Sequence, residues 1–286
     1  MIMISGKTSI YGLFGYPVEH SFSPGMHNAA FAKLGLDACY VPFAVHPDQL
    51  EAAVRSILAL NLRGMNVTVP HKQAVMSWLD EFSEEARLIG AVNTIEVLGD
   101  RLKGHNTDGR GFLRSLKDDA GFNPRGKRVV FIGSGGAARA VGFSLALAGA
   151  RSIVFMDLDY RKAAALAEDI RQKTGADVHP ISEDLLADAA AGADCLINAT
   201  PLGLKKADPL PMRKELIQKK HLVCDLVYNP PETLFLKAAK ARKAQQLSGI
   251  GMLLYQGVIA FEIWTKKKAP VQVMNNALAR QIRARR

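Results

Sequence analysis

A glycine-rich stretch at residues 133–140, GSGGAARA, has residue types and spacing that suit a phosphate-bearing ligand. It directly follows the apolar run VVFI, opens a helix-like pattern, and matches G-x-G-x-x-G/A through Gly133, Gly135 and Ala138. The glycines permit a tight turn and close approach of a pyrophosphate, whose charge the free amides of a helix start can bind. The stretch therefore predicts a dinucleotide site. A glycine turn that binds no ligand is the alternative.

An acidic residue at the end of the next apolar run bears on which dinucleotide binds. Asp157 closes SIVFMD, about 20 residues after the glycine loop. A carboxylate at that point accepts hydrogen bonds from the ribose hydroxyls of NAD and repels the 2′-phosphate of NADP. The residues favour NAD, although Arg161 and Lys162 follow closely and leave NADP open. As an alternative, Asp157 caps the start of the following helix.

A lysine follows a strand-like run in NVTVPHK, residues 66–72. The run alternates and is β-branched, and Pro70 stops it because proline has no amide hydrogen to donate. Lys72 is therefore expected at a strand-to-helix junction. A solvated surface lysine that opens the next helix is the alternative.

Polar residues in four further stretches occupy places that a core would not choose. Ser21 and Ser23 precede Pro24, which suits the first turn of a helix, so their hydroxyls would lie near a positive helix end that attracts a carboxylate. Serines at such places are also common helix caps. The remaining residues are Asn93 in GAVNT, Asn106 and Asp108 in GHNTDGRG, and Gln256 in MLLYQG, where a buried amide needs partners.

The elements that would carry these residues alternate between strand-like and helix-like patterns. The first third contains SIYGLFG, a helix over about 24–34, CYVPFAV, a helix through LEAAVRSILAL, RGMNVTV, helical sequence to about residue 89, and a hairpin of TIEV and RLKGH. A second series begins at Lys127 with short, wholly apolar runs, as expected for strands covered on both faces. The glycine- and charge-rich segment GRGFLRSLKDDAGFNPRG is interpreted as the domain boundary. This rhythm predicts an α/β fold with two domains.

Composition narrows the class of protein. The 286 residues are 48% hydrophobic and 22% charged, which is typical of a globular protein long enough for two domains, and no apolar run approaches a membrane span. We expect a cytoplasmic protein, because the start MIMISGKTSIYG lacks a signal-like core and Cys39, Cys195 and Cys224 form no CxxC pair. The formal charge of +10 favours anionic partners, but the basic tail RQIRARR lacks a nucleic-acid-binding motif. An anionic metabolite and a phosphate-bearing cofactor are expected, without a metal.

Eight ordered stretches together give a chain that resembles the shikimate dehydrogenases, including the quinate/shikimate dehydrogenases, over nearly its whole length. The matching stretches are GYPVEHSFSPGMHN, NVTVPHK, GAVNT, HNTDGRG, GSGGAARA, NAT at 198–200, DLVYNP and GMLLYQG. The resemblance implies an N-terminal α/β substrate domain, residues 1–107 and 252–286, and a Rossmann dinucleotide-binding domain, residues 108–251. It also implies that the C-terminal helices pack back on the first domain.

The resemblance further implies roles for individual residues. Reduction of 3-dehydroshikimate to shikimate, a step of the shikimate pathway of aromatic amino acid biosynthesis, would use Lys72 and Asp108 as the catalytic pair, with Lys72 at a carboxyl end of the sheet. Substrate ligands would be Ser21 and Ser23 for the carboxylate, and Thr68, Asn93, Tyr228 and Gln256 for the ring hydroxyls. Cofactor contacts would come from Gly133, Ser134, Gly135, Gly136, Ala137, Asp157, Thr200, Leu226, Gly249 and Met252.

At one place the chain departs from the usual NADP-dependent pattern of that family. Those enzymes commonly carry Asn-Arg-Thr after the second Rossmann strand, where this chain has Asp157-Leu158-Asp159, an acidic end like that of NAD-using quinate/shikimate enzymes. The pair Ser21 and Ser23 argues against quinate as the main substrate, because quinate-preferring relatives often have threonine second. The rival functions are a quinate/shikimate dehydrogenase with a catabolic role, a dehydrogenase of another small anionic hydroxy acid, and a nucleotide-binding regulator without turnover. The resemblance permits a monomer or a homodimer.

Overall fold

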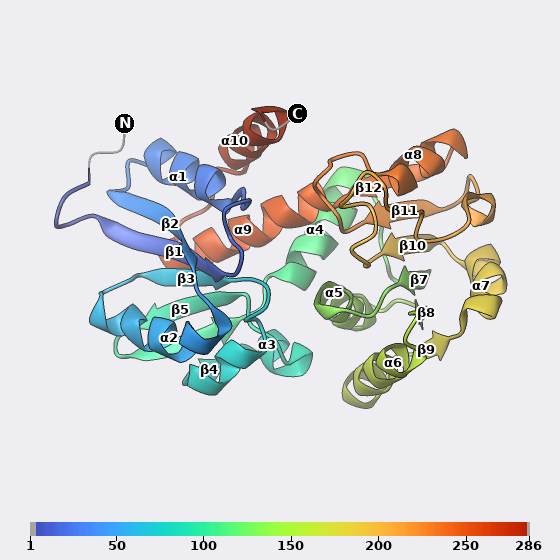
Figure 1. Cartoon of the computed structure of the whole chain (residues 1–286), viewed down its shortest axis with the longest axis horizontal. Helices are drawn as coiled ribbons and strands as arrows, with labels where there is room; N and C mark the ends of the chain where they lie inside the picture. The colour runs from blue at the N-terminus through green and yellow to red at the C-terminus, as the bar shows by residue number, and fades with distance from the viewer. Residues whose placement is uncertain (1–3, 285–286) are drawn as a thin grey trace. The chain divides into compact units, whose positions relative to one another are not determined.

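The computed structural model describes residues 4–284, which form two compact units (Figure 1). Unit 1 consists of residues 4–107 together with 256–284, and unit 2 consists of residues 108–255. Residues 1–3 of the start MIMISGKTSIYG and the last two arginines of the basic tail lie outside the described residues. Each unit is built on one six-stranded sheet.

The sheet of unit 1 is mixed, in the order β2-β1-β3-β5-β6-β4. Its strands are β1 (Ser9–Gly15), β2 (Ala38–Ala44), β3 (Gly64–Val67), β4 (Glu81–Phe82), β5 (Thr94–Leu98) and β6 (Arg101–His105). β1 lies parallel between β2 and β3, in the βα rhythm predicted from the sequence, whereas β5 runs antiparallel to both β3 and β6. The predicted hairpin of β5 and β6 is confirmed, and Gly99 turns it with a φ of 65°, a conformation that favours glycine.

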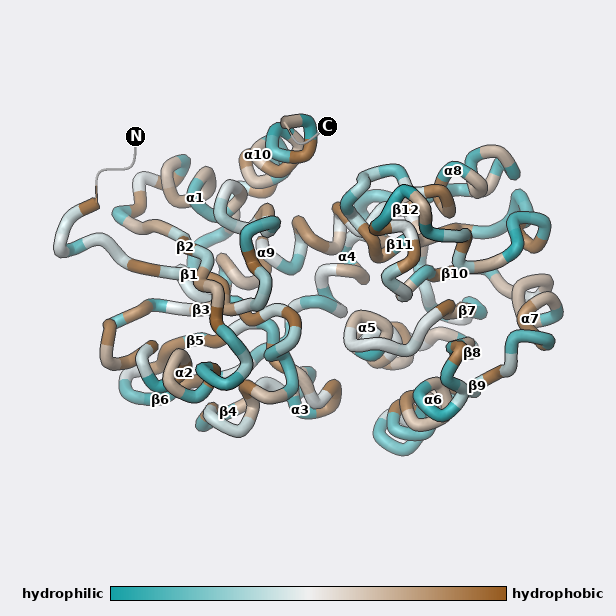
Figure 2. Tube along the Cα trace, in the orientation of Figure 1, coloured by the Kyte–Doolittle hydropathy of each residue, from teal (hydrophilic) through white to brown (hydrophobic). Residues whose placement is uncertain are grey.

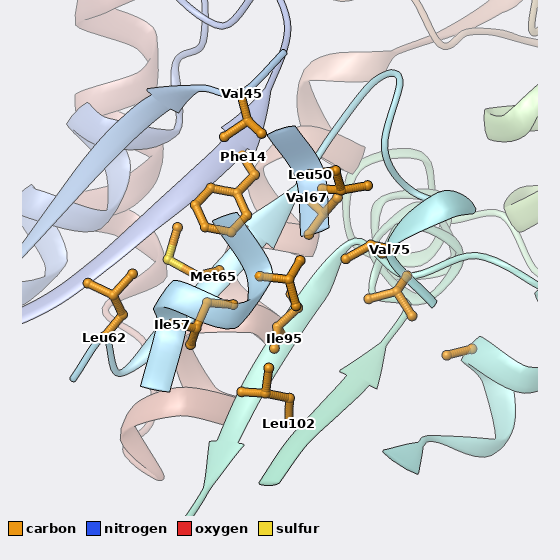
Figure 3. Close-up of a cluster of buried hydrophobic side chains, with 13 residues drawn as sticks. Phe14, Val45, Leu50, Ile57, Leu62, Met65, Val67, Val75, Ile95 and Leu102 are labelled. Carbon is orange, nitrogen blue, oxygen red and sulfur yellow. The ribbon is translucent and has the colours of Figure 1, made fainter. Parts of the chain in front are cut away.

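Helices and apolar side chains cover this sheet. α1 (Ser23–Lys33), α2 (Leu50–Ala59), α3 (Glu84–Ile89) and α10 (Val271–Ala284) belong to unit 1, together with most of α9 (Gly249–Thr265). A cluster of 13 buried residues, among them Phe14, Ile57, Met65 and Ile95, packs α2 against the strands (Figure 3). Full burial of one such large side chain contributes about 1.5–3 kcal/mol, so this cluster holds α2 and the sheet together.

The C-terminal helices pack on the first unit, as the resemblance implied. α10 lies against α1, and the side-chain amide of Gln281 donates to the carbonyl of Phe22 (3.1 Å). Near the end of α9, the indole of Trp264 donates to the carbonyl of Ile95 (2.9 Å). Its ring lies so close to β3 that a Cβ on Gly64 would meet it at 2.4 Å. These contacts join residues far apart in the chain into one unit.

The sheet of unit 2 is parallel throughout, in the order β12-β11-β10-β7-β8-β9. Its strands are β7 (Arg128–Ile132), β8 (Ser152–Met156), β9 (Val178–Ile181), β10 (Cys195–Asn198), β11 (Leu222–Asp225) and β12 (Gln245–Ser248). This is the doubly wound order of a Rossmann fold, and the order reverses between β7 and β10, where such folds bind dinucleotides. The predicted α/β class and Rossmann domain are confirmed.

The helices of unit 2 cover both faces of its sheet. They are α4 (Asp108–Ala120), α5 (Gly136–Leu147), α6 (Tyr160–Thr174), α7 (Leu186–Gly192) and α8 (Leu234–Ala241). α6 buries Ala163, Leu166, Ala167 and Ile170 and carries charged residues elsewhere, which gives it the mixed colouring in Figure 2. Within residues 4–284, no helix has the length and apolar character that crossing a membrane requires.

Three segments differ from the sequence-based expectations. The segment after NVTVPHK is not one helix to residue 89, because it contains a 3-10 helix (Ala74–Trp78), the short strand β4 and α3. The segment interpreted as a link is mostly helix α4, which buries Phe112 and Leu116. The sequence does not predict β12, since QQLS is polar and lies at the edge of the sheet.

Candidate active site

Lys72 lies just beyond the end of β3, in a turn that hydrogen bonds hold. The strand ends at Val67, and the amide of His71 donates to the carbonyl of Thr68 (2.9 Å). The carbonyl of Lys72 accepts from the amide of Val92 (2.7 Å), which precedes β5. The half-buried Lys72 therefore has a fixed backbone at the predicted strand-to-helix junction, two residues before the 3-10 helix that begins at Ala74.

Asn93 holds the segment that leads into Asp108. Its Oδ1 accepts from the amide of Thr107 (2.8 Å), and its Nδ2 donates to the hydroxyl of the same residue (2.9 Å). Asn93 and Asp108, the first residue of α4, are both buried. Because the neighbouring Val92 binds the Lys72 carbonyl, two adjacent residues hold both the Lys72 turn and the segment that ends at Thr107.

Ser21 and Ser23 lie at the start of α1. The N-cap of that helix is Phe22, which makes no side-chain cap hydrogen bond, and the hydroxyl of Ser21 accepts from the amide of Ser23 (3.2 Å). The Ser21 hydroxyl therefore satisfies one backbone amide at the start of α1, as a capping side chain would. Ser23 is buried, and its hydroxyl hydrogen-bonds Tyr40, whose pKa is raised by burial, with that hydrogen bond acting in the opposite direction.

A chain of buried polar groups continues from Tyr40 across the sheet. The Tyr40 hydroxyl donates to Oδ1 of Asn66 (2.8 Å). Nδ2 of Asn66 donates to the hydroxyl of Thr94 (3.0 Å), which donates in turn to Oδ1 of Asn93 (3.0 Å). Hydrogen bonds therefore run without a break from the serine at the start of α1 to the residue that holds the segment before Asp108.

The other predicted substrate ligands lie in three different places. The amide of Thr68 donates to the carbonyl of Phe14 (2.8 Å) directly after β3. Gln256 is half-buried in α9 and is the first residue of that helix that belongs to unit 1. Asn106, singled out with these residues, is buried and donates from Nδ2 to the carbonyl of Ala91 (3.0 Å). In unit 2, Tyr228 is half-buried in the loop after β11.

The glycine loop of unit 2 combines close packing with open backbone. Gly133 has a φ of 97°, and a Cβ there would meet Thr200 at 2.8 Å and Ala199 at 2.9 Å. A Cβ on Gly135 or Gly136 would meet no atom within 4 Å, so the loop is open where α5 begins. The first glycine is thus required by packing, and the next two leave backbone amides accessible to a ligand.

Asp157 follows β8 and binds the glycine loop. Its Oδ2 accepts from the amide (2.8 Å) and the hydroxyl (2.7 Å) of Ser134, and its Oδ1 accepts from the amide of Asp159 (3.0 Å). Burial acts to raise the pKa of Asp157, but these hydrogen bonds and the charge of Lys162 outweigh it and hold the pKa below its ordinary value. The N-cap of α6 is Asp159, so the capping alternative for Asp157 is wrong.

Thr200 follows β10 and lies next to the glycine loop. Its amide (3.1 Å) and its hydroxyl (2.7 Å) both donate to Oδ1 of Asn198, the last residue of β10. The predicted cofactor residues Gly133 and Thr200 are therefore in contact, since a Cβ on Gly133 would overlap Thr200.

The predicted cofactor residues near α9 form a second group in unit 2. Gly249 begins α9 and packs against the end of β11, because a Cβ there would meet the carbonyl of Leu226 at 2.5 Å. Met252 lies in the next residues of α9, and Ala137 lies in the first turn of α5. The structure thus brings Gly249 and Leu226 together and places Met252 and Ala137 on the helices that begin beside these loops.

Comparisons with known proteins identify the family of the chain. The family model of the shikimate dehydrogenase substrate binding domain matches residues 13–95, and that of the shikimate 5′-dehydrogenase C-terminal domain matches residues 249–279. A curated relative from Desulforamulus reducens, named shikimate dehydrogenase (NADP+), is 52% identical over 98% of this chain and 97% of its own length. The chain belongs to the shikimate dehydrogenase family.

Solved structures from the shikimate dehydrogenase family share the fold. A shikimate dehydrogenase in complex with NADP+ is 42% identical, with a TM-score of 0.91 over 98% of both chains. A shikimate 5-dehydrogenase from Listeria monocytogenes in complex with shikimate and NAD is 38% identical, with a TM-score of 0.91 over 96% of this chain and 98% of that one. As a shikimate dehydrogenase family member, the chain is an NAD(P)-dependent oxidoreductase.

The loops of this shikimate dehydrogenase family member suit a dinucleotide. Open glycines at the start of α5 leave room for a pyrophosphate, and Asp157 binds Ser134 of the same loop. Among the described residues, no group of three or more histidine, cysteine or acidic side chains could hold a metal ion. His27 is fully buried, and within residues 4–284 neither of its ring nitrogens has a hydrogen-bond partner; its ring stacks on Tyr40 at 4.4 Å.

Sequence reasoning assigns no role to several buried polar residues that hold the predicted ligands. Asn66 opens the motif NVTVPHK, Asn198 lies in NAT and Asp225 lies in DLVYNP. A signal exists in each case, because a polar residue within or at the end of a short apolar strand needs a buried partner. The sequence does not name that partner, since Asn198 and Asp225 belong to different strands.

Proposed function

We propose that this protein catalyses the reversible oxidation of shikimate to 3-dehydroshikimate, with unit 1 binding the acid and unit 2 binding the nicotinamide cofactor. The observation that carries the proposal is the hydrogen-bonded set in unit 1, in which Val92 and Asn93 hold the Lys72 turn and the segment before Asp108. Membership of the shikimate dehydrogenase family supports the same reaction, which serves aromatic amino acid biosynthesis.

The residues proposed to bind shikimate match its chemistry. Ser21 would donate its hydroxyl hydrogen to the carboxylate, and Ser23 would do the same by turning its hydroxyl away from Tyr40. The positive end of α1 also attracts the carboxylate. The ring hydroxyls would pair with side-chain hydroxyls and amides, supplied by Thr68, Asn93, Tyr228 and Gln256. Such a site rejects analogues that lack a hydroxyl, because its own buried groups would then stay unpaired.

The roles proposed for Lys72 and Asp108 follow from the charge that develops on the reacting oxygen. Acceptance of a hydride from the substrate carbon is the chemistry that the bound nicotinamide supplies. The hydroxyl oxygen on that carbon must lose its proton in the same direction of reaction. The ammonium of Lys72 would stabilise alkoxide character on the oxygen, and the carboxylate of Asp108 would orient the ammonium and help to move the proton.

NAD is proposed as the preferred cofactor, on the electrostatics around Asp157. The hydrogen bonds from Ser134 and Asp159 favour the ionised carboxylate, which repels a 2′-phosphate. The following Leu158 is 91% exposed and offers no cation for a 2′-phosphate. The ammonium of Lys162 lies 3.8 Å from a carboxylate oxygen of Asp159, which partly neutralises its charge. The name of the Desulforamulus relative favours NADP, and the two solved relatives contain NADP+ and NAD.

Initial rates of shikimate oxidation with NAD and with NADP test both proposals, and the same assay with quinate tests the substrate. We expect turnover of shikimate, with a higher kcat/KM for NAD than for NADP and a lower kcat/KM for quinate. A higher kcat/KM for NADP would overturn the cofactor proposal. Absence of shikimate turnover with either cofactor would overturn the substrate proposal.

Replacement of Lys72 tests the proposed chemistry. Lys72→Ala is expected to lower kcat by a factor of about 10² or more with a modest change in KM, because the lost group acts on the transition state. The matched control is Lys33→Ala, an exposed lysine at the end of α1 in the same unit, which should keep the wild-type kcat. A Lys72→Ala enzyme with unchanged kcat would remove Lys72 from the chemical step.

A further inference from the structure

A buried carboxylate in unit 2 lies outside the roles described so far. Asp225 ends β11 and is 1% exposed. Its Oδ1 accepts from Nδ2 of Asn198 (2.9 Å) and from the amide of Val227 (3.0 Å). Its Oδ2 accepts from the hydroxyl of Thr233 (2.5 Å). Burial raises the pKa of Asp225, and its hydrogen bonds act in the opposite direction. A single buried acceptor therefore collects donors from three segments.

Asn198 links Asp225 to the loop after β10 by hydrogen bonds. Asn198 is itself fully buried, and its Nδ2 also donates to the carbonyl of Leu202 (3.0 Å). Its Oδ1 accepts from the amide and the hydroxyl of Thr200. Because Thr200 packs against Gly133, the hydrogen bonds of Asp225 reach the glycine loop through only one intermediate side chain and Thr200.

Val227 ties the loop after β11 to Asp225 through its backbone amide. It lies between Leu226 and Tyr228, so the hydrogen bond from its amide fixes the backbone from which the Tyr228 side chain extends. The same loop packs against α9, because a Cβ on Gly249 would meet the Asp225 carbonyl at 3.0 Å. Thr233 closes the loop at its other end, where its hydroxyl caps α8 by accepting from the amide of Leu236 (3.3 Å).

These loops belong to one half of the dinucleotide-binding sheet. In a doubly wound sheet each half binds one mononucleotide, and the two halves meet where the strand order reverses. Asp157 lies on the half that contains β7, β8 and β9, and it faces the adenosine ribose in the proposed function. β10, β11 and β12 form the other half, so their loops are assigned to the nicotinamide end.

We infer that Asp225 is a positioning residue, which holds the Thr200 loop and the Leu226–Tyr228 loop in register so that the nicotinamide ring and the substrate are aligned for hydride transfer. The inference rests on the proposed function. A carboxylate suits this task because both of its oxygens accept, so it can orient donors from several loops at once. For packing alone, a neutral residue of similar volume would serve with a smaller desolvation cost.

Asp225→Asn tests this inference, because it keeps the shape but removes one acceptor oxygen. Misplacement of reacting groups by fractions of an ångström is costly, so we expect kcat for shikimate oxidation to fall about tenfold, with a higher KM for shikimate through Tyr228. In the reverse direction, the primary isotope effect on 3-dehydroshikimate reduction with NADH or NADPH deuterated at the transferred position should rise, since hydride transfer becomes slower. The affinity for NADH should fall, while the affinity for ADP, which occupies only the adenosine half, should stay unchanged.

Controls separate positioning from simple loss of stability. Thr233→Ser keeps the hydroxyl donor and should match the wild type. Thr233→Val removes that donor and should reproduce the effects expected of Asp225→Asn, so it replaces Asp225→Asn as the test if the Asp225→Asn protein does not fold. Ile170→Ala removes a fully buried side chain of α6 in the same unit, so it should lower Tm without changing the isotope effect. An Asp225→Asn enzyme with wild-type kcat and isotope effect, or with equal losses of ADP and NADH affinity, would overturn the inference.

Failure of the proposed function gives a different pattern. If the wild type does not oxidise shikimate, the substrate assignment falls on wild-type data alone. The affinity comparison then decides the inference without any substrate. Loss of NADH affinity with unchanged ADP affinity in Asp225→Asn would support it, and equal losses of both affinities would contradict it.

Discussion

The two units hold their buried polar residues in different ways. In unit 1 the network that contains Tyr40, Asn66 and Thr94 consists of neutral groups, each of which both donates and accepts. In unit 2 the corresponding network centres on the carboxylate of Asp225, which only accepts. The comparison shows two solutions to one problem, the fixing of loops at the end of a sheet.

Sheet topology explains the difference. The strands of unit 2 are parallel, so their carboxyl ends all lie on the same side of the sheet. One acceptor on that side can therefore bind donors from several loops. In unit 1, β3 and β5 are antiparallel, and Asn66 near the end of β3 pairs with Thr94 at the start of β5. The donors and acceptors there meet side by side on neighbouring strands, so neutral groups can satisfy one another in a row.

The largest expected effect comes from breaking the neutral network of unit 1. Asn66→Ala removes the acceptor of the Tyr40 hydroxyl and the donor to the Thr94 hydroxyl, which keeps only its bond to Asn93. Each lost partner costs about 1–3 kcal/mol, so we expect the free energy of unfolding to fall by about 3 kcal/mol. Both tryptophans, Trp78 and Trp264, belong to unit 1, so tryptophan fluorescence during a urea titration reports the unfolding of this unit.

The exposed Asn276→Ala on α10 is the matched control for Asn66→Ala, and it should change the urea midpoint little. Equal midpoints for the Asn66 and Asn276 variants would show that the network adds no stability to unit 1.

Acid should weaken unit 1 through His27. Burial lowers the pKa of His27 from 6.5 to about 3, so only the unfolded chain takes up this proton between those two values. Stability from this group is intact above pH 6.5 and is lost as the pH falls toward 3, by about 2 kcal/mol at pH 5. Tryptophan-detected urea midpoints at pH 7.5 and pH 5 measure the loss.

His27→Phe should remove most of that pH dependence, because a phenylalanine can keep the ring contact with Tyr40 without a titratable group. The carboxyl of Asp225 in unit 2 has the opposite sign. Its pKa is raised by burial, so its cost to stability falls as the pH is lowered. A His27→Phe protein with the full wild-type acid sensitivity would assign that sensitivity to other groups.

Asp157 should control cofactor choice in unit 2 with little effect on unit 1. Asp157→Ala is expected to weaken NAD more than NADP and to shift the ratio of their kcat/KM values by about tenfold, which corresponds to about 1.4 kcal/mol. The control is Asp159→Asn, which keeps a capping side chain for α6 and should leave the ratio unchanged. Equal changes in NAD and NADP affinity would exclude Asp157 as the ribose ligand.

The smallest expected effect concerns an ion pair at the far end of α9 in unit 1. Lys266 binds Glu96, which is buried and also pairs with His105 (2.8 Å). The Lys266 side chain is 69% exposed, so Lys266→Ala should cost about 0.5–1 kcal/mol by the same fluorescence assay. Glu96→Gln should cost more, because the one acceptor oxygen of glutamine cannot serve both Lys266 and the partly buried His105.

Much of the fold follows from local patterns in the sequence. The apolar runs that become β7, β10 and β11 are short and bounded, and glycine at position 99 marks the hairpin of unit 1 because the turn requires a positive φ. The 3-10 helix Ala74–Trp78 is too short to give a helical period, and α4 carries two glycines in its first turn, so both escape pattern recognition. The polar edge strand β12 depends on its pairing with β11.

The candidate site divides in a similar way. The glycine loop and Asp157 are visible in the sequence because spacing along the chain determines their geometry. The hydrogen bonds among Asn66, Tyr40 and Thr94 depend on strand pairing, and those of Asp225 depend on the order of parallel strands. The roles of the predicted substrate and cofactor ligands stay predictions until the variants are measured.

Unit 2 is one continuous stretch, whereas unit 1 is completed only by residues after Tyr255. During synthesis, β1, β3 and α1 therefore leave the ribosome before α10 and Trp264, which pack against them, have been made. Domains fold as units, so unit 2 can complete its folding first. Until residues 256–284 have been made, the N-terminal sheet keeps an apolar face exposed. Co-translational folding should thus run from the middle of the chain outward, and chaperones would protect the first hundred residues longest.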